Sequence, residues 1–544
     1  MKKPALLFFA LLLISFSAMA QHEPWWKSTV FYEIYMPSFK DSNHDGKSDF
    51  KGMTSKLDYL QSLGIKGVWL TPFLKSPKVD NGYDIADYYQ IDPDYGDLKD
   101  FKNFINEAHR RNIKVIMDMV INHTSTECKW FQESRKSKTN PYRDYYIWSD
   151  QPNNWDSFFG GKAWAYDSTT QQYYYHKFAK KMVDLNWANP KVKTEVAKVL
   201  RFWLELGVDG FRMDVINFLS TDPDRKDNPV KKGQQVHKFD VDQKGVKEAI
   251  GMIKSVLNEY PDKFLVGEVG SDQLKVLKQY QSPKMLDVPF NFNFGSIPHF
   301  DAHRIFRELK DMERQMPGYP TLFFGSHDMP RLMSRLANND PDRASCLAAL
   351  MLTAKGVPFI YYGEEIGMTN IIAKDTTEIR DIQAMTHYHL ARSAGKNEKE
   401  AMQVANDNNR DKSRSPMQWN DFSHAGFSDH TPWIKVGQDY RHTNVAEEER
   451  NEQSLLHQYR QLLQLRSNHK ALQFGEYKYL KMNADCILFS REYQGETIQA
   501  IFNFSDHAQS INIHHQKVLI GKTDLQPNTF LIIQGNKKIK FNHD

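Results

Sequence analysis

Eight short runs of β-branched and aromatic residues alternate along the chain with longer amphipathic stretches. In residues 97–112 and 189–207, for example, apolar side chains recur at helical spacing, and each stretch ends near an Asn or a Gly. Short apolar runs alternating with helices are typical of parallel strands joined by helical crossovers. Eight such β/α units in succession predict an α/β fold, the (β/α)8 TIM barrel. The runs begin at or near Val30, Gly67, Val115, Gly210, Phe264, Leu286, Thr321 and Pro358.

Two connections in this pattern are too long to be ordinary barrel loops. One follows the third run, is rich in Trp, Tyr, Asn and Gly, and contains hairpin-like polar turns, so it predicts a small inserted subdomain over the barrel mouth. The other, at about 369–433, follows the eighth run. Near the C-terminus the pattern changes to short alternating strands, which predicts a compact all-β domain. The predicted organisation is a barrel over residues 21–123 and 189–473, an inserted subdomain over 124–188 and a C-terminal β-sandwich over 474–544.

The first twenty residues form a segment of their own. Two lysines precede an apolar stretch over residues 5–16, and Ala-Met-Ala at residues 18–20 gives the small-residue exit of a secretory signal. The alternative is an uncleaved membrane anchor, but the apolar stretch is short for a span of about 20 residues. Residues 1–20 therefore predict a cleaved export signal, a secreted or periplasmic protein and no stable membrane span after cleavage.

Composition and charge exclude several classes of protein. Charged residues make up 25% and the hydrophobic set 40% of the chain, which is ordinary for a soluble globular protein. The formal net charge of +4 is too small and too evenly spread to predict a nucleic-acid partner. Three cysteines allow at most one disulfide, so the chain is not a disulfide scaffold. What remains is a large soluble protein of more than one domain.

Four acidic or His-bearing motifs stand at the ends of predicted strands. They are DMVINH at 118–123, GFRMD at 210–214, GEV at 267–269 and SHD at 326–328. Parallel strands joined by helices bring their carboxyl ends to one face of a barrel, which is where barrel enzymes build their active sites. Carboxylates from three strands are therefore expected to converge on that face.

With NGYDIADY at 81–88 and RDKSRSPMQW at 410–419, these motifs resemble glycoside hydrolase family 13, the α-amylase family, over nearly the whole mature chain. Within that family the chain is most similar to the oligo-1,6-glucosidase and dextran glucosidase group. The resemblance implies retaining hydrolysis, in which one ionised carboxylate attacks the anomeric carbon and a second, protonated carboxyl assists the leaving oxygen. It implies Asp214 as the nucleophile, Glu268 as the acid/base and Asp328 as the third carboxylate, which stabilises the transition state.

Further residues are expected around these three carboxylates. Arg212 points to the same side of its strand as Asp214, and its charge would keep that carboxylate ionised. The resemblance implies that His123 and His327 donate hydrogen bonds to sugar hydroxyls, whereas Asp118 is expected to support the site from behind. It also implies that Tyr83 stacks on the terminal glucose while Asp84 and Arg414 pair and clasp it, which would make cleavage exo-acting. The alternative for the last three residues is a structural salt bridge and a packing tyrosine.

Residues 41–49 (DSNHDGKSD) place oxygen ligands at alternate positions with a Gly for the turn. The start is similar to an EF-hand, but position twelve is Gly52 rather than the bidentate Glu, so an EF-hand is excluded. The resemblance to the glucosidases implies a structural Ca²⁺, with an ordinary polar turn as the alternative. Its ligands would be Asp41, Asn43, Asp45, Asp49 and the backbone carbonyl of Lys47.

The predicted function is release of glucose from the non-reducing end of isomaltose and short isomalto-oligosaccharides, with maltose as a further candidate substrate. Val215, directly after the expected nucleophile, is similar to the α-1,6-preferring members of the family. Residues 269–271 (Val-Gly-Ser) depart from the Met-Pro-like continuation usual in oligo-1,6-glucosidases. The alternatives are an α-1,4-glucosidase, a transglucosidase or sucrose isomerase, a phosphotrehalose hydrolase, which the export signal disfavours, and a non-catalytic amylase-fold protein, which the three carboxylates disfavour.

Overall fold

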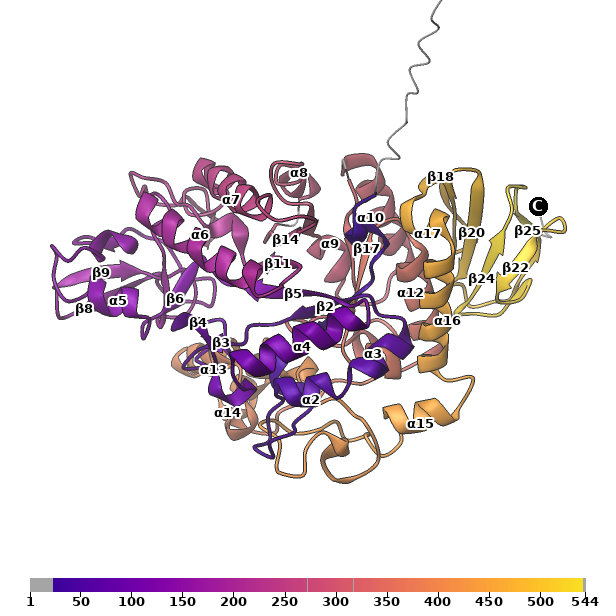
Figure 1. Ribbon diagram of the computed structural model, residues 1–544, viewed down its shortest axis with the longest axis horizontal. Helices are drawn as coiled ribbons and strands as arrows, with labels where there is room; N and C mark the ends of the chain where they lie inside the picture. Colours follow the sequence, from indigo (N-terminus) through magenta and orange to yellow (C-terminus); the bar gives the residue numbers. More distant parts are fainter. Residues whose placement is uncertain (1–22, 272, 317, 542–544) are drawn as a thin grey trace, which may run out of the picture.

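The computed structural model describes residues 23–271, 273–316 and 318–541. Eight parallel strands form one sheet at its centre, in the spatial order β15-β14-β11-β5-β2-β1-β17-β16 (Figure 1). The two outermost strands approach each other, and the amide of Asn291 donates a hydrogen bond to Oγ1 of Thr321 at 2.8 Å. The predicted barrel and its eight strands are thereby confirmed. The strands are β1 (Phe31–Ile34), β2 (Gly67–Leu70), β5 (Lys114–Met119), β11 (Gly210–Met213), β14 (Phe264–Glu268), β15 (Val288–Phe290), β16 (Thr321–Leu322) and β17 (Val357–Tyr361).

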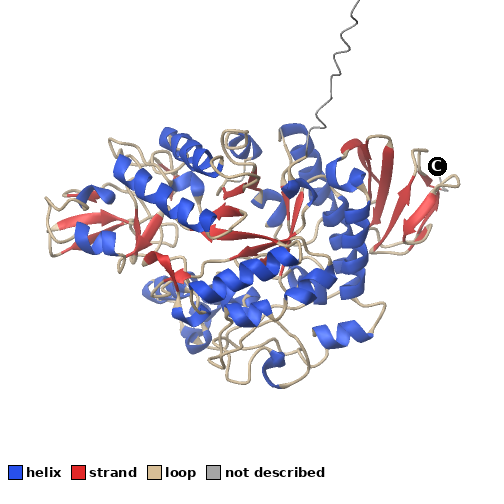
Figure 2. Ribbon diagram, viewed as in Figure 1, coloured by secondary structure: helices blue, strands red, loops and turns tan. Residues whose placement is uncertain are grey.

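Helices surround this sheet because each presents one apolar face to it (Figure 2). In α4, Phe101, Phe104 and Ile105 are buried, and Asp97 with Asp100 forms a capping box at the first turn. The outer helices are α3 (Leu57–Leu63), α4 (Leu98–Arg110), α6 (Pro190–Glu205), α7 (Lys244–Leu257), α8 (Leu274–Lys278), α10 (Ala302–Gln315), α12 (Pro341–Thr353) and α16 (Leu455–Asn468). Shorter helices are α1 (Trp25–Ser28), α2 (Phe50–Thr54), α9 (Phe292–Gly295), α11 (Leu332–Arg335), α15 (Val445–Arg450) and α17 (Lys470–Phe474).

The insertion after β5 forms a lobe at the left of Figure 1. Its elements are β6 (His123–Ser125), α5 (Lys129–Ser134), β7 (Trp148–Ser149), β8 (Trp164–Asp167), β9 (Gln172–Tyr175) and β10 (Met182–Asp184), with β6 paired to β10 and β9 between β7 and β8. A segment that the sequence pattern did not assign to this lobe packs against it. Residues 220–243, which carry the small hairpin β12 (Val230–Lys231) and β13 (Gln234–Gln235), are joined to it by a buried ion pair of 2.6 Å between Lys177 and Asp240.

The second excursion folds into two helices in contact, α13 (Ile382–Ser393) and α14 (Glu398–Asp407). A short 3-10 turn, Arg410–Ser413, follows them. A small antiparallel pair, β3 (Leu74–Lys75) and β4 (Asp87–Ile91), lies near these helices in Figure 1. The loop between β3 and β4 carries Asp80 and Tyr83 and comes from near the start of the barrel sequence. The 3-10 turn Arg410–Ser413, with which the RDKSRSPMQW motif begins, comes from near its end.

The C-terminal region is all β, as predicted, and lies at the right of Figure 1. A five-stranded antiparallel sheet is made of β18 (Glu476–Asn483), β19 (Cys486–Tyr493), β20 (Glu496–Asn503), β24 (Thr529–Gln534) and β22 (Lys517–Ile520). A three-stranded sheet is made of β23 (Asp524–Leu525), β21 (Gln509–Asn512) and β25 (Lys540–Phe541). The first sheet packs on α12 of the barrel.

Three further observations bear on the sequence analysis. The expected export signal, residues 1–20, lies outside the described residues. Within the part of the chain that is described, none of the helices combines the length and apolar character needed to cross a bilayer. Cys128, Cys346 and Cys486 are all buried as free thiols, so they form no disulfide with one another.

Candidate active site

The carboxyl ends of β5, β11 and β14 bring acidic side chains to one point. Asp118 lies near the end of β5, Asp214 directly follows β11, and Glu268 is the last residue of β14. Because Arg212 and Asp118 are register partners on adjacent strands, their side chains lie on the same face of the sheet. The period of two in a strand then brings the side chain of Asp214 to the same side as that of Arg212.

One guanidinium group joins all of these carboxyl groups. Nη1 of Arg212 lies 2.9 Å from Oδ1 of Asp118 and 2.8 Å from Oδ1 of Asp214, and Nη2 contacts Oε2 of Glu268. Arg212 is only 2% exposed and its guanidinium packs on the Trp69 ring. Asp214 and Glu268 thus share one guanidinium, and a retaining glycosidase needs its two carboxyl groups roughly 5 Å apart.

The pKa values of these groups are set mainly by burial. Burial raises the pKa of Asp214 to about 7, although the charge of Arg212 opposes that shift. Burial likewise raises the pKa of Glu268 to about 8 and that of Asp118 to about 6, again against Arg212. The contact expected between Arg212 and Asp214 is present, but it does not keep the pKa of Asp214 at its ordinary value. The order of the pKa values still leaves Asp214 ionised at a pH where Glu268 is protonated.

A hydrogen-bonded chain runs behind the pocket from Glu33 through His327 and Tyr83 to Asp118. Nδ1 of His327 lies 2.6 Å from Oε1 of Glu33, and Nε2 lies 2.7 Å from the Tyr83 hydroxyl, which donates to Asp118 at 3.0 Å. Burial raises the pKa of Glu33 well above its ordinary value. The rings of Tyr83 and His327 stack at 5.5 Å, which fixes the tyrosine in place.

Asp328 lies on the other side of the pocket and is held by two arginines. Oδ1 of Asp328 is 3.3 Å from Nη2 of Arg414 and 3.6 Å from Nη1 of Arg410. Burial raises the pKa of Asp328, but His327 and the two arginines outweigh it and lower the pKa to about 2. Asp328 is therefore ionised throughout the neutral range, unlike Glu268.

These residues surround a pocket of about 370 Å³ at the carboxyl end of the barrel. Its wall includes Tyr83, His123, Asp214, Glu268 and Asp328. Phenylalanines from the inserted lobe and from the loop after β11 form the apolar side of the mouth: Phe158, Phe159, Phe178 and Phe218. The first of these is 59% exposed, so an aromatic face stands open beside the carboxyl groups.

Comparison with known proteins decides the family. The sequence profile described as Alpha amylase, catalytic domain, matches residues 33–475, which is most of the chain. The chain belongs to the α-amylase family of glycoside hydrolases. An oligo-1,6-glucosidase of Halalkalibacterium halodurans is 38% identical over 93% of this chain and 94% of its own length. A glucan 1,6-alpha-glucosidase of Streptococcus pneumoniae is 36% identical over 92% of this chain and 96% of its own length.

Solved structures agree with this assignment. The crystal structure of an isomaltulose synthase from Klebsiella sp. LX3 superposes with a TM-score of 0.89 at 33% identity, covering 94% of this chain and all of that one. The α-amylase family thus accounts for the barrel, the inserted lobe and the C-terminal β domain together. The barrel that the sequence predicted and the family resemblance on which the site residues were chosen are both confirmed.

Two of the predicted sugar-binding residues lie elsewhere than expected in this α-amylase family member. Asp84 and Arg414, both in the described part of the chain, form no ion pair with each other. Asp84 is fully buried and accepts hydrogen bonds from Ser76 and from two backbone amides of its own loop. The acidic and basic residues that do pair at the pocket wall are Asp80 and Arg410, with 2.6 Å between Oδ1 and Nη2. The ion pair expected of Asp84 and Arg414 is therefore formed by Asp80, which directly precedes the NGYDIADY motif, and Arg410, the first residue of RDKSRSPMQW.

The remaining predicted residues fall into two groups. Tyr83 and His123 are part of the pocket wall, and Nε2 of His123 lies 3.1 Å from the Tyr83 carbonyl oxygen. His327 lies behind Tyr83, and Arg212 lies beneath the carboxylates. The sequence reasoning missed Asp80, Arg410 and the four phenylalanines. Asp80 stands three residues before Tyr83 and Arg410 opens the RDKSRSPMQW motif, but sequence alone gives no reason to prefer them over Asp84 and Arg414.

The five expected calcium ligands all lie in the loop before α2. Oδ1 of Asp41 accepts from the amides of Asn43 and His44, while Oδ2 accepts from Gly46 and Ser428. Asp49 accepts from Gly52 as the N-cap of α2. Over the described residues, no group of three or more His, Cys, Asp or Glu side chains gathers as a metal site. The loop is thus closed by hydrogen bonds to its own amides, and calcium binding stays a prediction.

Proposed function

We propose that this chain is an exo-acting, retaining α-glucosidase that releases glucose from isomaltose and short isomalto-oligosaccharides. The observation that carries the proposal is the contact of one guanidinium, that of Arg212, with both Asp214 and Glu268 at the ends of neighbouring strands. This contact sets a potential nucleophile and a potential proton donor side by side in a pocket. Their pKa values differ in the order that the two roles require.

The proposed reaction has two steps that share one carboxyl pair. In the first, Asp214 attacks the anomeric carbon and the glycosidic C–O bond breaks, while Glu268 gives its proton to the leaving oxygen. In the second, Glu268 removes a proton from water, the water oxygen bonds to the anomeric carbon and the ester bond to Asp214 breaks. Asp328, ionised and held by Arg414, faces the positive charge that develops on the sugar in both steps.

The expected exo action rests on the pair of Asp80 and Arg410. Arg410 also contacts Asp381 at 2.5 Å and packs over the Phe159 ring, so its guanidinium is fixed on three sides. A buried charged pair of this kind offers both donors and acceptors to the hydroxyls of one terminal sugar. A longer chain could then enter only with its non-reducing end first.

The preference for α-1,6 linkages is proposed from Val215 and from the relatives named for that linkage. Val215 lines the pocket and directs its amide at Oε2 of Glu268 from 3.4 Å. Its backbone is left-handed, with φ of 36° and ψ of 47°, a conformation that is rare for a β-branched residue. A β-branched side chain in the pocket wall, directly after the proposed nucleophile, narrows the space open to the leaving sugar. A flexible 1,6 linkage tolerates this restriction better than a 1,4 linkage does.

The substrate range can be measured directly. Residues 21–544 should release glucose from isomaltose faster than from maltose, trehalose or sucrose at equal concentration, and Asp214→Asn should release none from any of them. Val215→Thr, which keeps the side-chain shape, should lower the ratio of isomaltose to maltose activity about tenfold, the scale on which small pocket changes act.

A different preferred substrate, or products other than free glucose, would change the proposed function. A preference for maltose in the parent protein would keep the mechanism and overturn the linkage. Isomerised sucrose or longer oligosaccharides in place of free glucose would mean that a sugar rather than water attacks the Asp214 ester. Release of glucose by Asp214→Asn at the parent rate would contradict the mechanism itself.

The pH dependence of the reaction follows from the two raised pKa values. Activity needs Asp214 ionised and Glu268 protonated, so kcat/KM should fall below about pH 7, where Asp214 gains a proton, and above about pH 8, where Glu268 loses one. Isomaltose measures this profile because its leaving oxygen must be protonated by Glu268. On a 4-nitrophenyl α-glucoside, whose leaving group needs little protonation, the alkaline limb should be much weaker, and an equal alkaline limb on both substrates would assign it to another group.

We also propose that the loop over residues 41–49 binds calcium, on the strength of its alternating oxygen ligands. Bound only by the folded state, the ion would raise the melting temperature in proportion to the logarithm of its concentration. We therefore expect 5 mM Ca²⁺ to raise, and EDTA to lower, the melting temperature of the parent protein by a few degrees, as measured by calorimetry. Asp45→Ala should abolish the difference, and an equal melting temperature in both buffers would refute the site.

Residues 1–20 are proposed to direct export to the periplasm or the medium. The support is the sequence pattern of this segment. N-terminal sequencing of the protein recovered from an expressing bacterium would find Gln21 first if the proposed cleavage occurs.

A further inference from the structure

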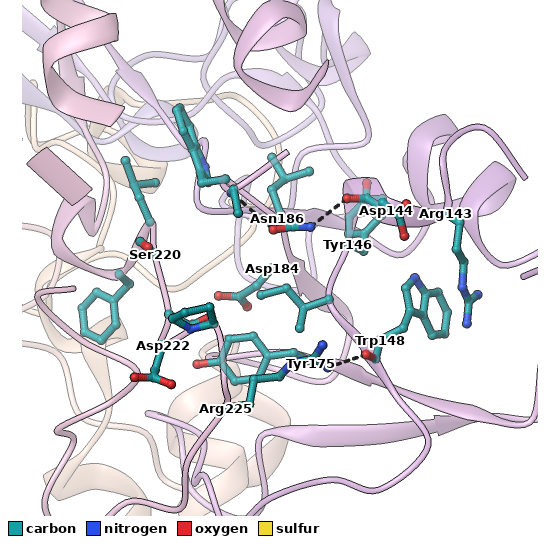
Figure 3. Close-up of a pocket in the computed structure, with 18 of the residues that line it drawn as sticks. Arg143, Asp144, Tyr146, Trp148, Tyr175, Asp184, Asn186, Ser220, Asp222 and Arg225 are labelled. Atoms are coloured by element: carbon teal, nitrogen blue, oxygen red, sulfur yellow. Dashed lines mark hydrogen bonds between the residues drawn. The ribbon is translucent and has the colours of Figure 1, made fainter. Parts of the chain in front are cut away.

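A second cavity, of about 470 Å³, lies next to the catalytic pocket and is not used by the proposed reaction (Figure 3). It lies between β9 and β10 of the inserted lobe on one side and residues 218–225 on the other. We call it the interlobe cavity. Phe218 lines both this cavity and the catalytic pocket, so one side chain forms a common wall.

Two buried polar side chains point into the interlobe cavity, as Figure 3 shows. Tyr175 is 1% exposed, and among the described residues its hydroxyl has no hydrogen-bond partner. Asp184 is 2% exposed, and its two oxygens accept one hydrogen bond each, from Nδ2 of Asn122 at 2.9 Å and the Lys177 amide at 2.7 Å. Each carboxylate oxygen can accept a second bond. A hydroxyl that lacks a partner and a carboxylate with spare capacity face the same space.

The lining of the interlobe cavity indicates the kind of molecule that fits. Three basic residues, Lys138, Arg143 and Arg225, are matched by three acidic ones, Asp144, Asp184 and Asp222. This balance favours a neutral ligand over an anion or a metal ion. Aromatic and aliphatic side chains supply the rest of the wall, among them Trp148 and Leu219. Apolar faces combined with paired hydrogen-bonding groups suit a sugar ring, which presents C–H faces and a rim of hydroxyls.

We propose that the interlobe cavity binds one unit of a neutral glucose-containing saccharide, separately from the catalytic pocket. The Tyr175 hydroxyl and the Asp184 carboxylate hold sugar hydroxyls, and Ala188, which is exposed, forms part of the cavity wall. The choice of a glucose-containing ligand rests on the proposed function. The existence of the site rests on the cavity and its two buried polar groups.

Isothermal titration of the Asp214→Asn protein with isomaltotriose tests this inference, because hydrolysis is then absent while both sites remain. Two classes of site are expected. Ala188→Trp, which adds a large side chain at an exposed position of the cavity wall, should remove one class of site. Ala394→Trp, at an exposed position between α13 and α14, should leave both classes. Tyr175→Phe should weaken the same class about fivefold, the effect of one lost hydrogen bond, without lowering the melting temperature.

Each other outcome overturns the inference. A single class of site in the Asp214→Asn protein means that the cavity takes no saccharide. A second class that survives both Ala188→Trp and Tyr175→Phe lies elsewhere on the molecule. Failure of the proposed function is seen separately, as a lack of glucose release by the parent protein. In that case, binding of isomaltotriose that is removed by Ala188→Trp would still support the proposed saccharide site in the interlobe cavity.

Discussion

Replacement of Asp214 by Asn should lower kcat/KM on isomaltose by at least about 10⁴-fold, which is the fall typical of replacing one member of a group of residues that act together in catalysis. The amide cannot form the ester with the anomeric carbon, whereas Arg212 still contacts Asp118 and Glu268. Initial rates of glucose release measure the effect. Because burial already disfavours the charged form of Asp214, a neutral amide of the same shape should fold as well as the parent.

The fold of this variant is checked by its melting temperature, which should lie within a few degrees of the parent value. Asp311→Asn, at an aspartate of α10 whose side chain is 41% exposed and pairs with Arg314, is the matched control and should leave kcat/KM unchanged. A fall of less than tenfold in Asp214→Asn, with the fold intact, would contradict the assignment of Asp214 as nucleophile.

Replacement of Arg212 by Met should lower the free energy of unfolding by about 3–5 kcal/mol at pH 8, because three carboxyl groups, two of them buried and that of Glu268 16% exposed, lose their common cation. The loss should be smaller at pH 5. Without the guanidinium, the folded-state pKa values of Asp118, Asp214 and Glu268 rise further above their unfolded values. A carboxyl group whose pKa is raised in the folded state lowers the free energy of unfolding as pH rises, and this loss disappears when the group is protonated. Urea unfolding at pH 5 and pH 8 measures both effects.

A second buried arginine serves as the control for Arg212. Arg466 is 1% exposed and donates to the carbonyl oxygens of Leu352 and Gly356. These acceptors do not titrate, so Arg466→Met should destabilise the protein by a similar amount at pH 5 and pH 8. Equal losses for Arg212→Met at the two pH values would mean that its role is packing on Trp69 rather than charge compensation.

The barrel could be predicted from sequence because each strand has a local signature. Runs such as those at Val115 and Phe264 are apolar on both faces, as strands between helices must be, and helical spacing marks the segments between them. The polar residues that follow these strands converge because the parallel strands of a barrel all end on the same face. The proximity of Asp214 and Glu268 could therefore be predicted. These predictions needed no information about loop structure.

Loop residues could not be placed in the same way. Asp80 and Asp84 lie on one turn, four residues apart, and only the path of that turn decides which one faces Arg410. The same holds for Arg410, which begins the 3-10 turn after α14, and Arg414, which directly follows that turn. The pairing of Lys177 with Asp240 joins segments about 60 residues apart, and neither side carries a local signal for the other. Long-range contacts between irregular segments depend on the whole fold.

The left-handed backbone of Val215 has a consequence for the thermal tolerance of the enzyme. A β-branched residue in that conformation costs roughly 1–3 kcal/mol, which neighbouring contacts must offset. Glycine would adopt the same backbone more easily, so Val215→Gly is an obvious route to a more heat-resistant protein. The same change removes a side chain that lines the catalytic pocket directly after the proposed nucleophile. Selection for heat resistance and selection for linkage discrimination therefore act on this position in opposite directions.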